Sequence, residues 1–301
     1  MADARDNLAG LASLHTHSRY CDGHGELAEY AREALAAGLL AYGASAHSPV
    51  PFPCECAIPI GNLPAYSAEV RRLKDEYAGR LPVYFGLELD FLPGLADFYA
   101  RELFTWQLDY VVASVHYVDG EYPDAWCYDE TDERFVREVT TRHGGDARPI
   151  VEDYFRRVGL MLRDAPSWGL PVIVGHLDRI VLWNVDDCYF PTEGAWYRDL
   201  VDDALAAIAR SGCVLEINTS GWNKKIGAPN PNADVLRRAA DRRIPVIVSA
   251  DAHWPANVAQ HFPRGVAVLR EAGYSTLTVP EPSGWRQIPL PALEPASRGA
   301  P

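Results

Sequence analysis

Histidine and carboxylate side chains recur in closely spaced sets along this chain of 301 residues. His15 and His17 are separated by one residue, Asp22 follows them, and Asp251 and His253 form a second such pair. In an extended chain, side chains two residues apart lie on the same side, so each pair can reach one ion. Borderline divalent metals such as Zn, Mn and Fe take imidazole together with carboxylate, whereas Ca and Mg sites use oxygen atoms. The sequence therefore predicts a site for divalent metal ions.

Short β-branched or aromatic runs precede these polar residues and predict β-strands. The seven candidate strands are residues 11–15, 40–44, 82–87, 110–115, 171–174, 214–217 and 245–249. The clearest stretches with helical spacing between them are residues 26–37, 65–77, 151–162, 197–210 and 233–240. This alternation is typical of βα units around a parallel sheet. Because the first strand lacks a glycine-rich phosphate turn, the pattern favours a closed or nearly closed barrel over an open sheet.

In such a barrel the carboxyl ends of the strands converge on one mouth. The candidate metal ligands at or just after the strand ends are His15, His17, Asp22, His47, Glu88, His116, His176, Asp251 and His253. Glu88 lies in an apolar run, where an isolated carboxylate needs a partner. Glu216 and Asn218 lie at the sixth strand end, and Glu216 is expected either to contact a substrate or to make a structural hydrogen bond.

Composition and charge narrow the class of protein. Hydrophobic residues make up 48% of the chain and charged residues 23%, which excludes disordered and fibrous classes. The net charge of −13 disfavours nucleic acids and anionic membranes as partners and favours a small substrate. No apolar run approaches the roughly 20 residues of a spanning helix, and the first residues are too polar for a signal peptide, so we expect a cytoplasmic protein. Its six cysteines are too scattered for a disulfide framework.

We expect one large domain with irregular ends. Residues 1–10 are expected to be disordered, residues 11–275 to form the barrel, and the Pro-rich residues 276–301 to form an extended tail. Residues 118–148 form a long acidic insertion, and a loop of that length is usually a lid or a disordered segment.

Seven short motifs together resemble those of the PHP (polymerase and histidinol phosphatase) family. They are residues 15–23, 46–52, 86–90, 114–117, 175–178, 216–221 and 249–253. More narrowly, they resemble the monofunctional histidinol-phosphatase branch of that family. The resemblance extends from about residue 11 to residue 275 and so covers nearly the whole chain.

The resemblance implies an α/β fold, a distorted, TIM-like (βα)7 barrel with two or three divalent ions (Zn, Mn or Fe) at its mouth. The ligands implied for the three metals are, in order, His15, His17 and Asp251; His116 and His176; and Asp22, His47 and His253. Glu88 is implied to bridge the first and second metals. The position of Asp22 is histidine in some relatives, and His24 is the alternative ligand there.

The activity implied by the resemblance is hydrolysis of L-histidinol phosphate to L-histidinol and inorganic phosphate, in histidine biosynthesis. The expected nucleophile is a metal-bridging hydroxide, and the leaving group is protonated by Asp251, by His253 or by metal-bound water. The candidate residues for binding substrate or phosphate are Arg179, Arg157, Arg19, Lys224, Glu216 and Asn218. The acidic insertion is expected to face the positively charged end of the substrate.

Two other functions are compatible with the same motifs. One is a PHP phosphoesterase that acts on nucleotides or short oligonucleotides, which the negative net charge disfavours. The other is a metal-binding PHP module with a structural or regulatory role, for which loss of a ligand would be the sign. None of the nine candidate ligands is missing.

Overall fold

The computed structural model describes residues 8–122, 124–282 and 284–292. Seven parallel strands form one sheet in the order β1-β2-β3-β4-β7-β8-β9. Their bounds are β1 Ala12–Ser13, β2 Ala41–Ala44, β3 Val83–Asp90, β4 Tyr110–Ser114, β7 Val172–Val174, β8 Val214–Asn218 and β9 Val246–Ser249. Each of the seven predicted strands overlaps one of these, so the predicted barrel of βα units is confirmed.

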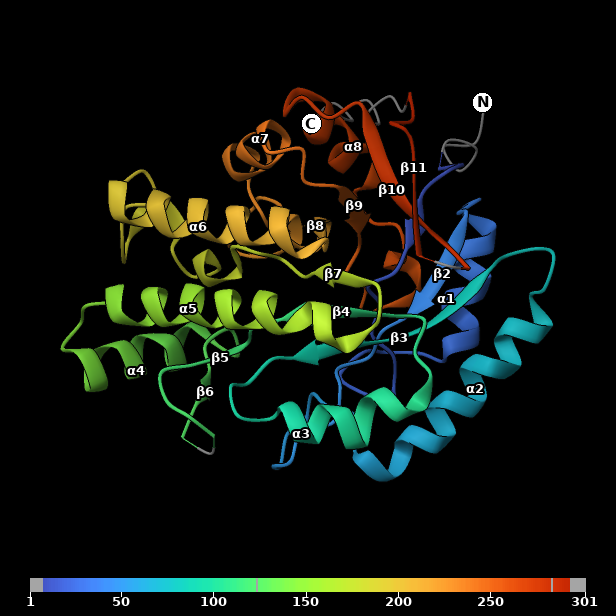
Figure 1. The fold of residues 1–301 in the computed structure, drawn as a ribbon, viewed down its shortest axis with the longest axis horizontal. Helices are drawn as coiled ribbons and strands as arrows, with labels where there is room; N and C mark the ends of the chain where they lie inside the picture. The colour runs from blue at the N-terminus through green and yellow to red at the C-terminus, as the bar shows by residue number, and fades with distance from the viewer. Residues whose placement is uncertain (1–7, 123, 283, 293–301) are drawn as a thin grey trace, which may run out of the picture.

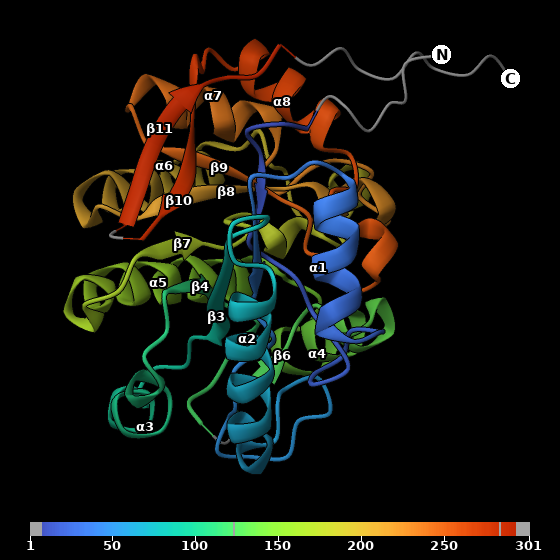
Figure 2. The same ribbon diagram turned by 90° about the vertical axis from the view of Figure 1, so that its right-hand side faces the viewer.

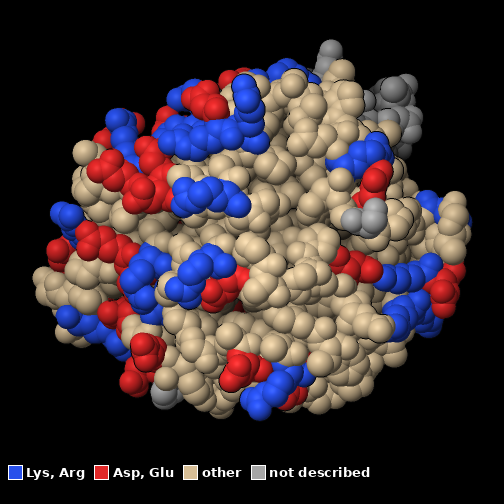
Figure 3. All heavy atoms as spheres, viewed as in Figure 1, with Lys and Arg blue, Asp and Glu red and all other residues tan. Residues whose placement is uncertain are grey.

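Helices surround the strands (Figures 1 and 2). They are α1 Leu27–Ala36, α2 Leu63–Glu76, α3 Ala96–Phe98, α4 Asp132–His143, α5 Arg148–Asp164, α6 Ala195–Ser211, α7 Ala233–Asp241 and α8 Phe262–Glu271. The five helices predicted from sequence correspond to α1, α2, α5, α6 and α7. None of the described helices is long and apolar enough to cross a membrane. On the face shown in Figure 3, the described basic side chains stand beside acidic ones rather than forming one continuous stripe.

The barrel closes between its first and last strands, just beyond their ends. Thr16 and Ala252 form a parallel bridge. The main-chain nitrogen of His17 donates to the carbonyl of Ala252 at 2.8 Å, and that of Ala252 donates to the carbonyl of His15 at 3.2 Å. The two segments joined in this way are the ones that carry the two closely spaced pairs of candidate ligands. Closing the barrel therefore brings ligands from the two ends of the sheet together.

A small apolar layer fills the barrel interior. It consists of Ala12, Leu14, Ala41, Tyr110, Val112, Ile173, Val214 and Ile247. Tyr110 is the largest of these side chains, and its hydroxyl donates to the carbonyl of Leu14 at 2.6 Å. Its ring lies so close to β3 that a Cβ atom added at Gly86 would be 2.5 Å from it. Glycine at position 86 therefore makes room for the tyrosine that links β4 to the end of β1.

The described part of the expected C-terminal tail has a different structure. Strands β10 (Thr276–Glu281) and β11 (Gly284–Pro289) pair as an antiparallel hairpin, which lies over one end of the barrel (Figure 2). Leu277 and Val279 are buried, and Trp285 packs against the interior layer. A two-stranded ribbon leaves free edges where the missing N–H of proline is tolerated, so the prolines do not prevent pairing. Residues 1–7 and 293–301 lie outside the described residues.

The described part of the acidic insertion is folded, so the alternative of a disordered segment is corrected. It contains a ribbon of β5 (Tyr117–Val118) and β6 (Trp126–Cys127), followed by helix α4. The Thr131 side chain caps α4 by accepting from the nitrogen of Arg134 at 3.1 Å, and Phe135 and Val139 are buried. Part of the acidic run is the first turn of α4, where carboxylates stabilise a helix. The insertion is thus packed against the barrel.

The packing around Tyr110 predicts the effect of one added methyl group. Gly86→Ala is expected to lower the free energy of unfolding by about 1–3 kcal/mol, because the methyl group overlaps a ring that its hydrogen bond holds in place. Gly61→Ala is the matched control, since a Cβ there has no heavy atom within 4 Å. Urea unfolding of both variants measures the difference. Equal stability of the two variants would contradict the fixed position of Tyr110.

Candidate metal centre

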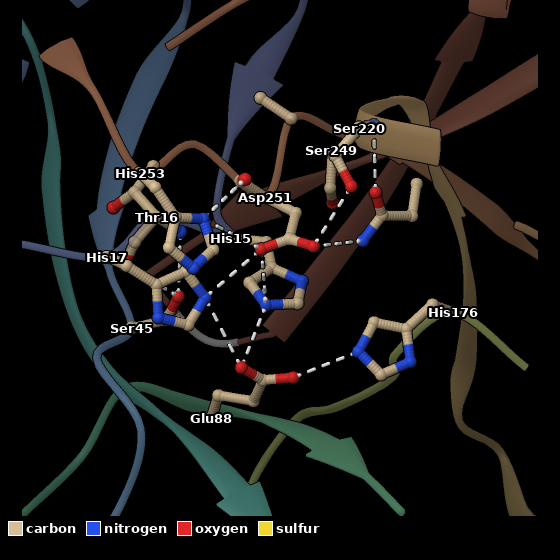
Figure 4. Close-up of polar contacts among 12 residues, drawn as sticks. His15, Thr16, His17, Ser45, Glu88, His176, Ser220, Ser249, Asp251 and His253 are labelled. Carbon is tan, nitrogen blue, oxygen red and sulfur yellow. Dashed lines mark hydrogen bonds and ion pairs between the residues drawn. The ribbon is translucent and has the colours of Figure 1, made fainter. Parts of the chain in front are cut away.

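Glu88 lies at the centre of a buried cluster of histidines at the barrel mouth (Figure 4). Its Oε2 atom lies 3.1 Å from Nε2 of His15 and 3.3 Å from Nε2 of His17. Its Oε1 atom lies 3.1 Å from Nε2 of His176 and 3.6 Å from Nε2 of His116. Glu88 comes from β3, and the histidines follow β1, β4 and β7. The two carboxylate oxygens therefore face different sets of histidines.

Several sets of three candidate ligands have donor atoms that all lie within 4.8 Å of one another. Among them are His15, His17 and Glu88; Glu88, His116 and His176; and His17, Asp251 and His253. The first two sets correspond to the ligands expected for the first and second metals, with Glu88 in both. Oδ1 of Asp251 lies 3.2 Å from Nε2 of His17 and 3.8 Å from Nε2 of His15, so it also faces the first set.

The residues expected around the third metal are arranged more loosely. Oδ2 of Asp22 lies 3.4 Å from Nε2 of His253 and 3.9 Å from Nε2 of His47. His24, the alternative to Asp22, instead stacks its ring on Trp254 at a centroid distance of 3.9 Å. Of these two candidates, the structure brings Asp22 to the cluster.

The segment from Asp251 to His253 corrects one step of the sequence argument. Asp251 has a φ of 47°, in the left-handed region, so the chain is not extended there and simple alternation does not align the pair. Both side chains nevertheless face His17: Oδ1 of Asp251 lies 3.2 Å from its Nε2 atom, and the ring of His253 stacks on its ring with centroids 4.3 Å apart. Strained backbone of this kind gathers at functional sites.

The residues fit a bound divalent cation. The Nε2 atoms of His15 and His17 are buried and make no hydrogen bond within the described part of the chain. Both atoms lie near Oε2 of Glu88, at 3.1 and 3.3 Å. A polar atom buried without a hydrogen bond costs about 1–3 kcal/mol, and a bound cation would offset this cost. Imidazole and carboxylate together form the donor set that borderline divalent metals prefer.

Asp90 holds two of the histidines from behind. Its carboxylate accepts from Nδ1 of His116 and, at 3.2 Å, from Nδ1 of His47. Bonds of this kind fix the tautomer, so that Nε2 of each ring keeps a lone pair for a metal. Asp90 stands two residues after Glu88 on β3, so both carboxylates project from the same face of the strand.

Glu216 and Asn218 have a similar supporting position. Glu216 accepts from Nδ1 of His15 at 2.7 Å and from the main-chain nitrogen of His176 at 2.8 Å. The side-chain amide of Asn218 donates to Asp251 at 3.2 Å. Neither residue lines the cavity in front of the cluster. Of the two roles expected for Glu216, the structure thus favours the structural one, and the expected substrate contact of Asn218 is corrected in the same way.

The cluster sets the charge state of its members. Burial opposes ionisation of Glu88, but the surrounding histidines, led by His15, hold its pKa well below the usual value. Burial together with neighbouring imidazoles lowers the pKa of His17 to about 4. The pKa of His15 is raised against the effect of burial, by Glu216 first. At neutral pH Glu88 is therefore ionised and His17 neutral, whereas a metal that binds His15 must displace a proton.

The cluster opens into a cavity of about 620 Å³, a size that suits a small ligand. Its lining includes the cations Arg134, Arg179 and Lys224 and the carboxylates Asp129 and Glu130. The Nε atom of Arg179 donates to Asp129 at 3.1 Å. Its Nη1 atom is buried and has no hydrogen-bond partner among the described residues. This atom lies 3.9 Å from Oδ2 of Asp251 and so can still donate a hydrogen bond to a ligand.

Comparison with known proteins identifies the family. Residues 13–220 match the family model of the PHP domain. This chain belongs to the PHP family. It is 34% identical to a protein of Deinococcus radiodurans named probable histidinol-phosphatase, an alignment that covers 90% of this chain and 97% of that protein. It is 29% identical to the histidinol-phosphatase of Bacillus subtilis, over 81% and 94% of the two chains.

A solved structure has the same fold as this PHP protein. The histidinol phosphate phosphatase of Lactococcus lactis, complexed with Zn, L-histidinol and phosphate, superposes with a TM-score of 0.66. The match has 20% sequence identity and covers 92% of this chain and 98% of the other. It supports the barrel architecture along nearly the whole PHP chain.

Two of the cations expected to bind phosphate lie outside the cavity of the PHP barrel. Arg157 is buried in α5, where its Nε donates to Asp153 at 2.6 Å and its Nη2 donates to the carbonyl of Gly120. Arg19 is 57% exposed and pairs with Glu26. Both arginines are therefore corrected to structural or surface roles, whereas Arg179 and Lys224 line the cavity as expected.

Sequence reasoning missed several residues of the site. Asp90 lies within one of the quoted motifs, and its spacing from Glu88 on one strand is the signal that could have identified it. Asp129, Glu130 and Arg134 come from the segment between β6 and α4 and its first turn, which was expected to be irregular. The acidic insertion was expected to face the substrate, but no local pattern indicates which of its residues reach the barrel mouth.

The bridging position of Asp90 predicts the effect of a minimal substitution. Asp90→Asn is expected to weaken metal affinity about 10–100-fold, because one of the two ring N–H groups then faces an amide donor instead of an acceptor. Competition with a chelator, followed by elemental analysis, measures this affinity. Asp199→Asn, on the exposed surface of α6, is the matched control. Metal retention equal to that of the control would rule out a positioning role for Asp90.

Proposed function

We propose that this PHP protein is a metal-dependent phosphomonoesterase that hydrolyses L-histidinol phosphate to L-histidinol and inorganic phosphate. The observation that carries the proposal is the 34% identity to a named probable histidinol-phosphatase over 90% of the chain. The cavity adds support, because candidate metal ligands and cationic side chains meet in one space of about 620 Å³. Phosphate ester hydrolysis needs both kinds of group.

The proposal includes two or three divalent ions of Zn, Mn or Fe. Their proposed ligands are His15, His17, Glu88 and Asp251 for the first; Glu88, His116 and His176 for the second; and Asp22, His47 and His253 for the third. When bound, such ions supply Lewis-acid polarisation of the phosphoryl oxygens and acidify water at neutral pH. The Zn in the Lactococcus lactis structure agrees with this class of ion.

Arg179 is the residue proposed to bind the phosphoryl group. Its guanidinium is held on one side by Asp129, so the fork is already oriented when the substrate arrives. Its Nη1 atom makes no hydrogen bond among the described residues and lies 3.9 Å from Oδ2 of Asp251. It can donate to a phosphoryl oxygen, and a charged hydrogen bond of this kind contributes about 1.5–3 kcal/mol. Lys224 lines the same cavity and adds a second positive charge.

For a two-ion form, in which His253 is not a ligand, we propose His253 rather than Asp251 as the acid that protonates the departing alkoxide. Nearby histidines hold the pKa of Asp251 well below its usual value although burial opposes this, so it has no proton to give at neutral pH. His253 is 30% exposed at the cavity, and Asp22 and Asp251 raise its pKa against burial. One ring nitrogen cannot both bind an ion and donate a proton, so only a two-ion form leaves Nε2 of His253 available as the acid.

The proposed substrate can be tested by phosphate release. The protein is reconstituted in turn with Mn, Zn and Fe and assayed with L-histidinol phosphate, a nucleotide bisphosphate and an aryl phosphate. We expect a kcat/KM for L-histidinol phosphate at least roughly a hundredfold above the others, about 2.7 kcal/mol of transition-state discrimination. His17→Ala is expected to abolish turnover. A preference for the nucleotide would replace the substrate assignment, and no turnover by the metal-loaded protein would favour a structural module.

The role of Arg179 can be tested by a substitution that keeps the charge. Arg179→Lys is expected to lower kcat/KM about 10–100-fold, because a lysine cannot hold Asp129 and a phosphoryl oxygen with one planar group. Arg163→Lys, at a position whose side chain is 68% exposed, is the matched control. Steady-state kinetics of both variants gives the comparison. Unchanged kinetics in Arg179→Lys would remove Arg179 from the phosphate site.

A further inference from the structure

Cys54 and Cys56 line the cavity but have no part in the proposed hydrolysis. They lie in the irregular connection between β2 and α2, and their Sγ atoms are 2.7 Å apart. Neither cysteine belongs to a set of three clustered candidate metal ligands in the described ranges of the chain. Metal binding therefore does not explain why these two cysteines line the cavity.

The connection that carries the two thiols is anchored at both ends beside candidate ligands. The main-chain nitrogen of Ser48 donates to the carbonyl of Glu88 at 2.7 Å, and that of Ile58 donates to the carbonyl of His47 at 3.1 Å. Residues 48–59 between these anchors form neither helix nor strand. The backbone near the thiols is thus free of ladder hydrogen bonds, while the ends of the loop are fixed to the site.

The two thiols are not equivalent. The Sγ atom of Cys54 has two neighbours: the Sγ atom of Cys56 and, at 3.4 Å, the hydroxyl of Tyr117. Hydrogen bonds, first from Cys56 and then from Tyr117, lower the pKa of Cys54 to about 6 against the effect of burial. The pKa of Cys56 is raised, chiefly by its bond to Cys54. Cys54 is therefore the thiolate and the nucleophile at neutral pH, with a second thiol in contact.

We propose that Cys54 and Cys56 form a reversible dithiol–disulfide site that is oxidised by a low-molecular-weight disulfide. The Cys54 thiolate attacks one sulfur of the small disulfide, forms a mixed disulfide and expels one small thiolate. That thiolate takes the proton of Cys56, and the Cys56 sulfur then attacks Sγ of Cys54 and expels the second small thiolate, which takes a proton from water. Two protein thiols and one small disulfide thus give one protein disulfide and two small thiols.

Oxidation at this place changes the wall of the cavity. Both sulfur atoms line it, and the loop that must adjust to the new bond is hydrogen-bonded to His47 and Glu88 at its ends. The thiol pair thereby connects the redox state of the surrounding small thiols to the shape of the site. This inference does not depend on which phosphate ester the protein hydrolyses.

Mass spectrometry of the native full-length protein tests the proposal. The reduced protein is incubated with oxidised glutathione, its remaining thiols are alkylated, and it is digested with trypsin. The peptide of residues 33–71 contains Cys54 and Cys56 and no other cysteine. We expect this peptide to lose the mass of two hydrogen atoms, to escape alkylation and to carry no glutathione, and we expect a reductant to reverse the change.

Single substitutions separate the two steps. Cys56→Ser is expected to stop at the mixed disulfide and to accumulate glutathione on Cys54, whereas Cys54→Ser is expected to form neither product in the same time. Cys188→Ser, which removes an exposed thiol, is the matched control and should behave like the wild type. Full alkylation of both thiols in the wild-type peptide, or a stable glutathione adduct on it, would overturn the proposal whether or not the variants fold.

Discussion

The buried carboxylate of Glu88 is the constraint on which the rest of the structure depends. A charge that is 1% exposed is costly unless opposite charges and donors surround it. Histidines from several different strand ends provide that surrounding, so the strands must be in register to deliver them. Glu88 pairs with Val112 on β4, and a slip by one residue would turn its side chain to the other face of the sheet. Barrel register and site are therefore specified together.

Closure of the barrel and the position of the candidate ligands also depend on the same contacts. The main-chain bonds that join the first and last strands run through His15, His17 and Ala252, which lie in the two ligand-bearing segments. Below them, Tyr110 fills the interior and ties β4 to the carbonyl of Leu14, next to His15. Movements of the ligands are thus restricted by bonds that also hold the barrel closed. Such restriction keeps a site ordered before a ligand arrives.

Sequence predicted the strands, and it selected candidate ligands that the structure brings together, because both signals are local. A buried strand is a short apolar run, and a histidine or carboxylate directly after it is visible in the chain itself. The roles of Arg157 and Asp90 depend on tertiary contacts: Arg157 turns to Asp153 and Gly120, and Asp90 turns to two histidines. The β10–β11 hairpin was missed because its prolines suggested an irregular tail, although Leu277 and Val279 alternate as in a strand.

The acidic insertion shows how a misread segment can still contribute to function. Its carboxylates suggested a lid for a positively charged substrate, but Asp119 pairs with Arg142 and His143 of α4, within the insertion itself. Asp129 instead orients the guanidinium of Arg179, which follows β7 in the chain. An acidic residue of the insertion thus acts on the cation proposed to bind phosphate. The insertion also brings the carboxylate of Glu130 to the cavity wall, so it contributes both to the proposed phosphate site and to the rest of the cavity, which Tyr117 lines as well.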